Sequence, residues 1–197
     1  MKKVFIVASL CLTLLAGVWV LKLQAAEKAV VDAIKKLAAD VAAGKDAKTV
    51  MASGEKIAKG AAEEDVFLVM ELFAKRKASG KGGLGIGAKP GAITPDGIEA
   101  KLINMGRRVT TSDMKNAKEL KEMADITAAG GATTYHLAPS KVKKNAAKLA
   151  KWQKAAKDMY EQGIALSKAR KAEDKVAAKA AAKKLNLACV SCHNDFR

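Results

Sequence analysis

Residues 174–193, with the sequence DKVAAKAAAKKLNLACVSCH, contain the pattern that decides the fold of this chain. Small and apolar residues recur here every three or four positions, which is the spacing of one face of an α-helix. The residues on this face are Ala177, Ala181, Leu185 and Ala188. The stripe runs directly into Cys189 and Cys192, so the sequence predicts a final helix that ends at two cysteines and a histidine.

The same periodicity predicts helices along most of the chain. They are expected at about 30–41, 46–62, 63–76, 98–107 and 141–171, together with one that starts after an N-cap at Ser112 and ends before Pro139. No convincing run has the two-residue period of a strand, so the predicted fold class is all-α.

Residues 79–97 differ from the rest because they contain seven glycines and two prolines. Such a composition predicts a loop. The run from Gly82 to Gly87 lacks both the GxGxxG spacing and the Lys-Ser/Thr of phosphate-binding loops, so nucleotide binding is not expected. The loop either connects two helices or folds over the edge of a cofactor or partner.

The N-terminus has the pattern of an export signal. Lys2 and Lys3 precede an apolar run over residues 4–20, and small residues follow at Ala25 and Ala26. The cleavage site is weak, so an uncleaved membrane anchor is the alternative. We expect residues 1–26 to be the signal, and residues 27–197 to form one domain in the periplasm or an equivalent exported compartment.

The chain is strongly basic, with a formal charge of +16. Removing residues 1–26 takes away three lysines and no acidic residue, which leaves +13. Such a protein attracts acidic partners. Nucleic acid is a poor candidate, because the lysines alternate with alanines and no aromatic residues are interleaved for base stacking. The membrane is a partner only if the signal stays uncleaved.

The motif Cys189-Val190-Ser191-Cys192-His193 has the CxxCH spacing of covalent haem attachment, in which two thiols form thioethers and the histidine binds iron. A redox dithiol is the first alternative, but it normally sits at a helix N-terminus. A zinc site is the second, and beyond the motif the mature chain offers only the distant His136 as a further Cys or His ligand. The carboxylates are scattered among lysines, so an enzyme is not expected.

The C-terminal pattern resembles the cytochrome c′ family and its c-556 relatives, the class II c-type cytochromes. The resemblance covers the chain from about Ser112 to the end and implies a four-helix bundle with one haem c near the C-terminus. It assigns the thioethers to Cys189 and Cys192, the proximal iron ligand to His193, and a basic residue near the haem to Arg197. The glycine-rich loop and the helices ahead of it are additions, similar to those of planctomycete-type relatives.

The second axial position decides between two functions that this family combines. A Met or His ligand gives an electron carrier for redox proteins with acidic docking surfaces, whereas an apolar cover gives a five-coordinate haem that binds NO or CO. Met70 is the first candidate ligand; Met105, Met123 and His136 are the others. The resemblance also implies a homodimer through the face of residues 30–41, although that face serves equally well as intramolecular core.

Overall fold

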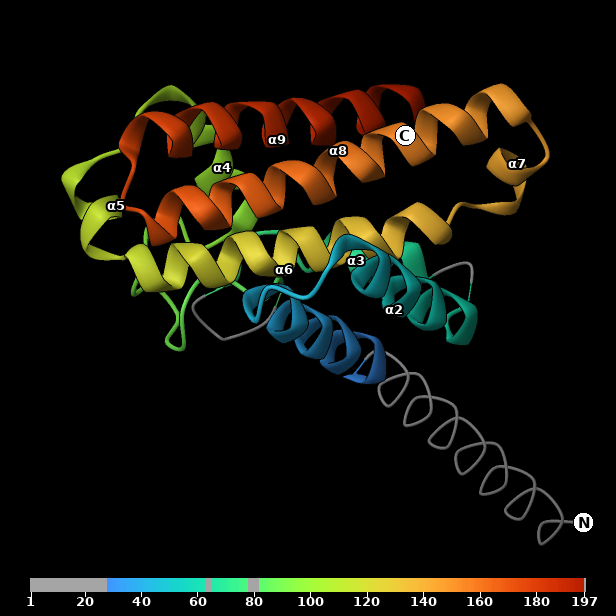
Figure 1. The fold of residues 1–197 in the computed structure, drawn as a ribbon, viewed down its shortest axis with the longest axis horizontal. Helices are drawn as coiled ribbons and strands as arrows, with labels where there is room; N and C mark the ends of the chain where they lie inside the picture. The colour runs from blue at the N-terminus through green and yellow to red at the C-terminus, as the bar shows by residue number, and fades with distance from the viewer. Residues whose placement is uncertain (1–27, 63–64, 78–81, 197) are drawn as a thin grey trace, which may run out of the picture.

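A computed structural model describes residues 28–62, 65–77 and 82–196, and all regular elements within these ranges are α-helices (Figure 1). The predicted all-α class is therefore confirmed. The signal segment and Arg197 lie outside the described residues. Residues 28–42 form the first helix, and the helices that follow are α2 (Ala47–Gly60), α3 (Asp65–Glu71), α4 (Ile98–Arg107), α5 (Thr111–Lys115), α6 (Ala117–His136), α7 (Ser140–Lys143), α8 (Ala146–Lys171) and α9 (Lys175–Phe196).

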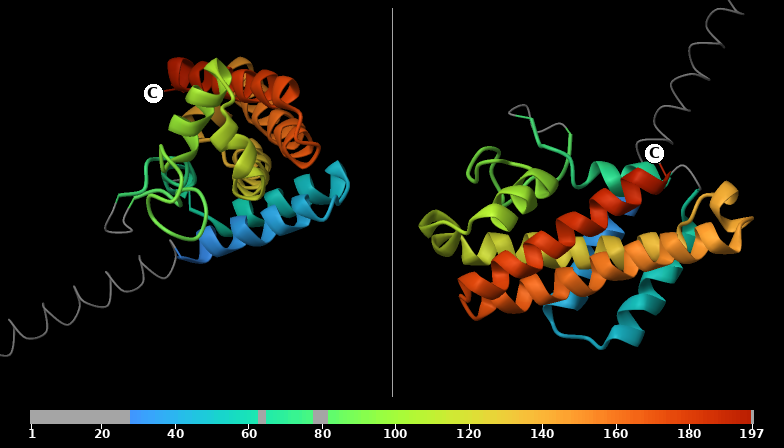
Figure 2. Two further views of the ribbon diagram at one scale, coloured as in Figure 1. Left: turned by 90° about the vertical axis from the view of Figure 1, so that its left-hand side faces the viewer. Right: turned by 90° about the horizontal axis from the view of Figure 1, so that it is seen from above.

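The long helices are stacked in layers. α6 packs against α8, α8 packs against α9, and α4 covers α9 from the side, as the two views of Figure 2 show. α2 lies on the other face of α6, beside the first helix. Within the described residues, no helix has the length and apolar character needed to cross a bilayer.

α6 and α8 approach each other closely because two glycines lie at their contact. A Cβ atom added at Gly163 would lie 2.7 Å from the backbone nitrogen of Ala128, and one at Gly131 would lie 2.6 Å from that of Tyr160. Real side chains do not tolerate such distances, so only glycine permits this spacing. Because of this close contact, α8 packs tightly on α6, and α9 packs on α8.

The apolar face predicted at residues 30–41 lies in the core of this single chain. Val30, Ile34, Leu37 and Val41 are each 8% exposed or less. This face therefore contributes to the intramolecular core, which was the alternative to a dimer contact.

Several helix boundaries differ from the sequence-based expectations. α3 ends at Glu71 rather than near residue 76. Thr110, not Ser112, is the N-cap: its side chain accepts from the backbone of Asp113, whose carboxylate accepts from the backbone of Thr110 in return. This capping box starts the short helix α5, and α6 begins only at Ala117.

The helix predicted for residues 141–171 is divided in two. α7 ends at Lys143, and Asn145 caps a new start for α8 by accepting from the backbone N–H of Lys148 at 3.0 Å. The final helix does not stop before the cysteines either, because α9 continues through the whole motif to Phe196. The loop prediction holds for residues 82–97, which form no helix.

Candidate functional site

A cavity of about 280 Å³ lies between α9, the long helices beneath it, and the chain around α3 and the start of α4. Its lining is mostly apolar. From α9 it includes Ala188, Cys189, Cys192 and His193; from the other helices and the turn after α3 it includes Phe67, Met70, Glu71, Phe73, Ala74, Ile98, Glu99, Leu102, Thr127, Thr134, Ala155, Ala156 and Met159. The cavity thus joins the predicted motif to residues more than one hundred positions away.

The C-terminal end of α9 is fixed against α8 and α6 by aromatic packing. The Trp152 and Phe196 rings meet edge to face, with centroids 5.2 Å apart. The Trp152 indole N–H donates to the Thr134 carbonyl at 2.7 Å. Because His193 lies one helical turn before Phe196, this contact also positions the histidine on the cavity wall.

Both thiols of the motif are held in their protonated form. Burial, followed by the charge of Glu99, raises the pKa of Cys189 to about 12. Burial and the charge of Asp195 raise the pKa of Cys192 to about 11. Redox-active dithiols need the opposite shift, since the thiolate is the nucleophile. These surroundings therefore disfavour the dithiol alternative.

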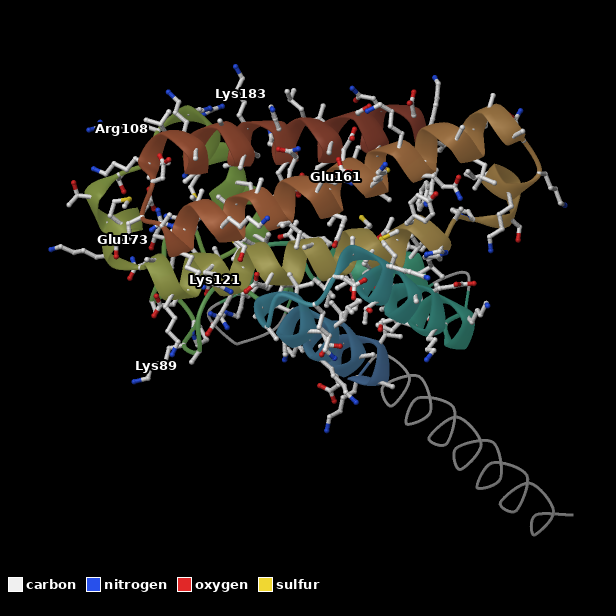
Figure 3. The ribbon with its side chains drawn as sticks, in the orientation of Figure 1. Lys89, Arg108, Lys121, Glu161, Glu173 and Lys183 are labelled. Atoms are coloured by element: carbon white, nitrogen blue, oxygen red, sulfur yellow. The ribbon has the colours of Figure 1, made fainter. Side chains whose placement is uncertain are left out.

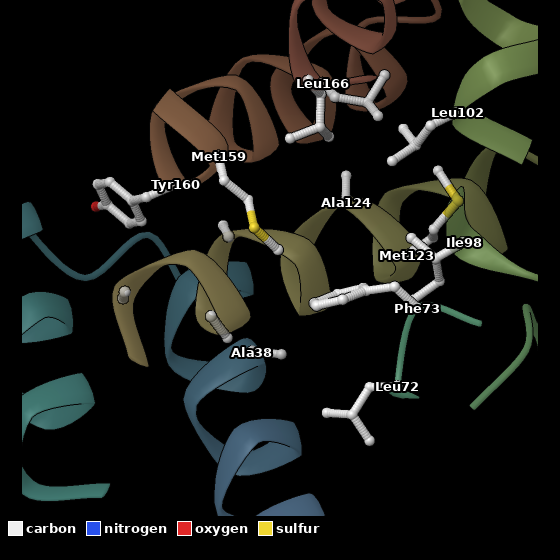
Figure 4. Packing of buried hydrophobic residues seen from close by; sticks show 14 of the residues in the cluster. Ala38, Leu72, Phe73, Ile98, Leu102, Met123, Ala124, Met159, Tyr160 and Leu166 are labelled. Atoms are coloured by element: carbon white, nitrogen blue, oxygen red, sulfur yellow. The ribbon is translucent and has the colours of Figure 1, made fainter. Parts of the chain in front are cut away.

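Two methionines line the cavity that His193 also lines. Met70 comes from α3 and is half-buried, whereas Met159 comes from α8 and is 6% exposed. Figure 4 shows the Met159 side chain directed toward Phe73 in the core. The sequence placed Met159 on the buried stripe of its helix, but no local pattern marked it as facing the motif.

The other candidate ligands lie elsewhere. Met105 and Met123 are fully buried and do not line the cavity. His136 lies at the end of α6, near Glu55 and Lys59, and its ring meets Tyr135. Burial is the main cause that lowers the pKa of His136, and its Nε2 atom is buried without a hydrogen-bond partner in the described structure. Met105, Met123 and His136 therefore do not line the cavity with His193, whereas Met70 does.

The wall that faces α9 is built from two segments joined by backbone hydrogen bonds. The Glu99 N–H donates to the Phe73 carbonyl at 3.0 Å, and the Arg76 N–H donates to the Asp96 carbonyl at 2.7 Å. Between these bonds, Lys75 and Gly97 form an isolated antiparallel bridge. The chain after α3 and the start of α4 are therefore joined into one wall.

A buried ion pair holds the glycine-rich loop against this wall. Arg76 Nε lies 2.9 Å from Asp96 Oδ2, with side-chain exposures of 10% and 8%. The second carboxylate oxygen accepts from the Ile86 N–H at 2.8 Å, and Oδ2 also accepts from the Gly91 N–H at 2.8 Å. The guanidinium donates to the carbonyls of Ile86, Gly87 and Lys89. The loop thus supports the cavity from outside rather than lining it.

No family model, curated protein or solved structure matches this chain. In the part of the chain that the structure describes, no group of three or more His, Cys, Asp or Glu side chains is arranged to hold a metal ion. Among the described residues, the motif cysteines therefore have no set of further His, Cys, Asp or Glu ligands arranged around them.

Proposed function

We propose that this protein is an exported monohaem c-type cytochrome of the class II type, which carries single electrons between redox partners. One observation carries the proposal: Cys189, Cys192 and His193 all line one mostly apolar cavity, and two methionine thioethers line it with them. This combines the covalent attachment motif, a proximal ligand and candidate distal ligands in a single site.

The residues present fit a haem. Cys189 and Cys192 would form the thioethers, and His193 would bind the iron. The cavity volume of about 280 Å³ is just below the ~300–1,000 Å³ of small-molecule sites, and exposed lining residues on α3 leave room for a group that protrudes. When bound, the haem supplies an iron that changes its charge by one electron.

The surrounding side chains would hold the group in a dry environment. Phe73, Ile98 and Leu102 are each 8% exposed or less and face the motif from the opposite wall. Apolar walls of this kind exclude water and so help to set the reduction potential. In this proposal α4, α6, α8 and α9 are the four helices of a cytochrome c′-type bundle, and the first helix, α2 and the loop are additions to it.

The distal ligand distinguishes this carrier from a second candidate function. Met70 is our first choice, because α3 places it in the cavity lining, and Met159 is its only rival among the described methionines. The apolar side chains Phe73, Ile98 and Leu102 favour the alternative, a five-coordinate haem that binds NO or CO, if neither thioether reaches the iron.

A visible spectrum tests both functions. The chain is produced with a haem-attachment system, and we expect a covalent haem with sharp α and β bands in the reduced state that do not change with CO. A broad high-spin spectrum that shifts with CO would refute the electron-carrier function and support the gas-binding function. Absence of any Soret band would refute both functions.

Two pairs of variants assign the ligands. Cys189→Ser with Cys192→Ser removes both thiols that would attach the haem, whereas His193→Ala keeps both thiols and removes the proximal ligand. Met70→Ala and Met159→Ala are matched substitutions on opposite sides of the cavity. We expect only Met70→Ala to convert the low-spin spectrum, and an unchanged Met70→Ala spectrum would refute this assignment.

A further inference from the structure

The opening of the cavity has a charge opposite to that of the whole chain. The exposed lining residues are Phe67, Glu71 and Ala74, all on α3 or the turn after it, so the cavity opens there. Among the lining residues that the structure describes there are two carboxylates, Glu71 and Glu99, and no lysine or arginine. A chain of net charge +16 therefore presents an acidic opening.

The composition of α3 extends this acidic character. Its sequence, DVFLVME, contains Asp65 and Glu71 and no basic residue. The nearest following cation, Lys75, is exposed and does not line the cavity. Lys101, on α4, is directed away from the opening, because its ammonium forms a buried ion pair with Asp113 at 2.6 Å. The carboxylates at the opening thus have no cation among the described lining residues.

Phe67 adds an apolar centre to this surface. Its side chain is 68% exposed, although it belongs to the cavity lining. Phe67 and Glu71 are four positions apart on α3, so they lie on the same helix face. Isolated exposed apolar residues are common, but an aromatic residue that shares the opening of a site with carboxylates has the composition of a docking surface.

The groove on the other side of α9 provides a contrast. It lies between α8 and α9, includes the same Ala155 and Ala188, and its charged residues are Lys151, Lys154, Lys184, Asp158 and Asp195. Lysine therefore exceeds carboxylate there. Lys183 also extends outward from α9 into solvent (Figure 3). This groove thus has one more lysine than carboxylates, whereas the cavity lining has two carboxylates and no lysine or arginine among the described residues.

We propose that a redox partner docks over the opening of the cavity through a basic surface, with Phe67 at the centre of the contact and Glu71 and Glu99 at its rim. This inference rests on the proposed haem function. It reverses the partner charge expected from composition, because the local field at the point of electron exchange, rather than the net charge, orients a docking partner.

The experiment uses the full haem-loaded chain and two small redox reagents, hexaammineruthenium as a cation and ferricyanide as an anion. Rates are measured between about 0.1 and 0.5 M salt, where the Debye length is about 10 Å or less, so that distant lysines are screened. We expect the rate with the cation to fall as salt rises and the rate with the anion to increase, because the opening attracts cations.

Charge reversal tests the assignment to these residues. Glu71→Lys with Glu99→Lys is compared with Glu122→Lys with Glu161→Lys; neither control residue lines the cavity, and each pair raises the formal charge from +16 to +20. The first pair should reverse the salt dependence of the rates and slow electron exchange with the cation about fivefold or more. The control pair should behave as wild type. Glu71→Lys alone tests the same effect if the double variant folds poorly.

A basic monohaem cytochrome serves as the protein probe. Phe67→Ser should slow its electron exchange about fivefold more than it slows the exchange with hexaammineruthenium, since the small ion needs no apolar contact. An unaltered haem spectrum shows that the site is intact. Wild-type rates that follow the net charge, or equal behaviour of the two charge-reversal pairs, would overturn the docking proposal. Absence of haem would instead refute the function on which it rests.

Discussion

Replacing Asp96 by Ala should destabilise the protein strongly, because this carboxylate connects the glycine-rich loop to the cavity wall. The substitution leaves the Arg76 guanidinium, whose side chain is only 10% exposed, without its counterion. It also leaves the N–H groups of Ile86 and Gly91 without their acceptor. Breaking a buried ion pair costs ~3–5 kcal/mol. Since Arg76 keeps three carbonyl acceptors, we expect about 3–4 kcal/mol.

Urea unfolding measures this loss. With a slope of ~1–3 kcal/mol per M, the midpoint should fall by roughly 1–4 M. Asp40→Ala is the matched control, because Asp40 pairs with Lys45 at 2.8 Å at a site where the side chains are 27% and 48% exposed. Exposed pairs contribute ~0–1 kcal/mol, so the control should change little. Equal midpoints for the two variants would show that the Asp96 pair does not hold the wall.

The same pair makes a prediction about pH. Burial raises the pKa of Asp96, but the hydrogen bonds from Arg76 and from the backbone of Gly91 and Ile86 outweigh it, so the pKa lies below its ordinary value. A depressed carboxyl pKa stabilises the folded state above the unfolded pKa of ~3.9 and loses this contribution as the pH falls through the folded pKa. The stability difference between wild type and Asp96→Ala should therefore persist at neutral pH and shrink below about pH 4. A difference that is constant from pH 7 to pH 3 would contradict this reasoning.

Three further predictions follow from the packing and the thiols. Gly163→Ala should cost ~1–3 kcal/mol in thermal unfolding, because its Cβ would lie 2.7 Å from Ala128, whereas Gly60→Ala, with open space around it, should not destabilise the fold. Trp152→Phe should cost ~0.5–1.5 kcal/mol, because it removes the indole donor to the Thr134 carbonyl, which keeps only the Leu137 N–H; an unchanged melting temperature would show that this hydrogen bond does not help to fix α9. In protein produced without haem attachment, alkylation of Cys189 and Cys192 at neutral pH should be at least ~100-fold slower than for an ordinary thiol, and rapid labelling would revive the dithiol alternative.

The motif and the helical class could be predicted from the sequence because both depend on short-range spacing. The stripe before Cys189 and the faces of the other helices repeat every three or four residues, which only a helix turns into a continuous apolar surface. The glycine-rich loop is equally local. The errors were at boundaries: the Thr110 to Asp113 capping box was visible as Thr-x-x-Asp, and Asn145 as a cap residue, but the apolar stripe alone did not reveal these breaks.

Only the tertiary structure decided what surrounds the motif. Met159 and the two carboxylates Glu71 and Glu99 come from segments that no sequence pattern links to His193, and they share a cavity with Met70 because α3, α4 and α8 pack around the same end of α9. The formal charge of +16 did not reveal the acidic opening, because a net charge does not say where on the surface the charged residues lie. The sequence determined the chemistry of the motif and the helices that display it. Folding brings distant side chains together around the motif. It therefore determined the cavity wall opposite the motif and the charge around the opening of the cavity.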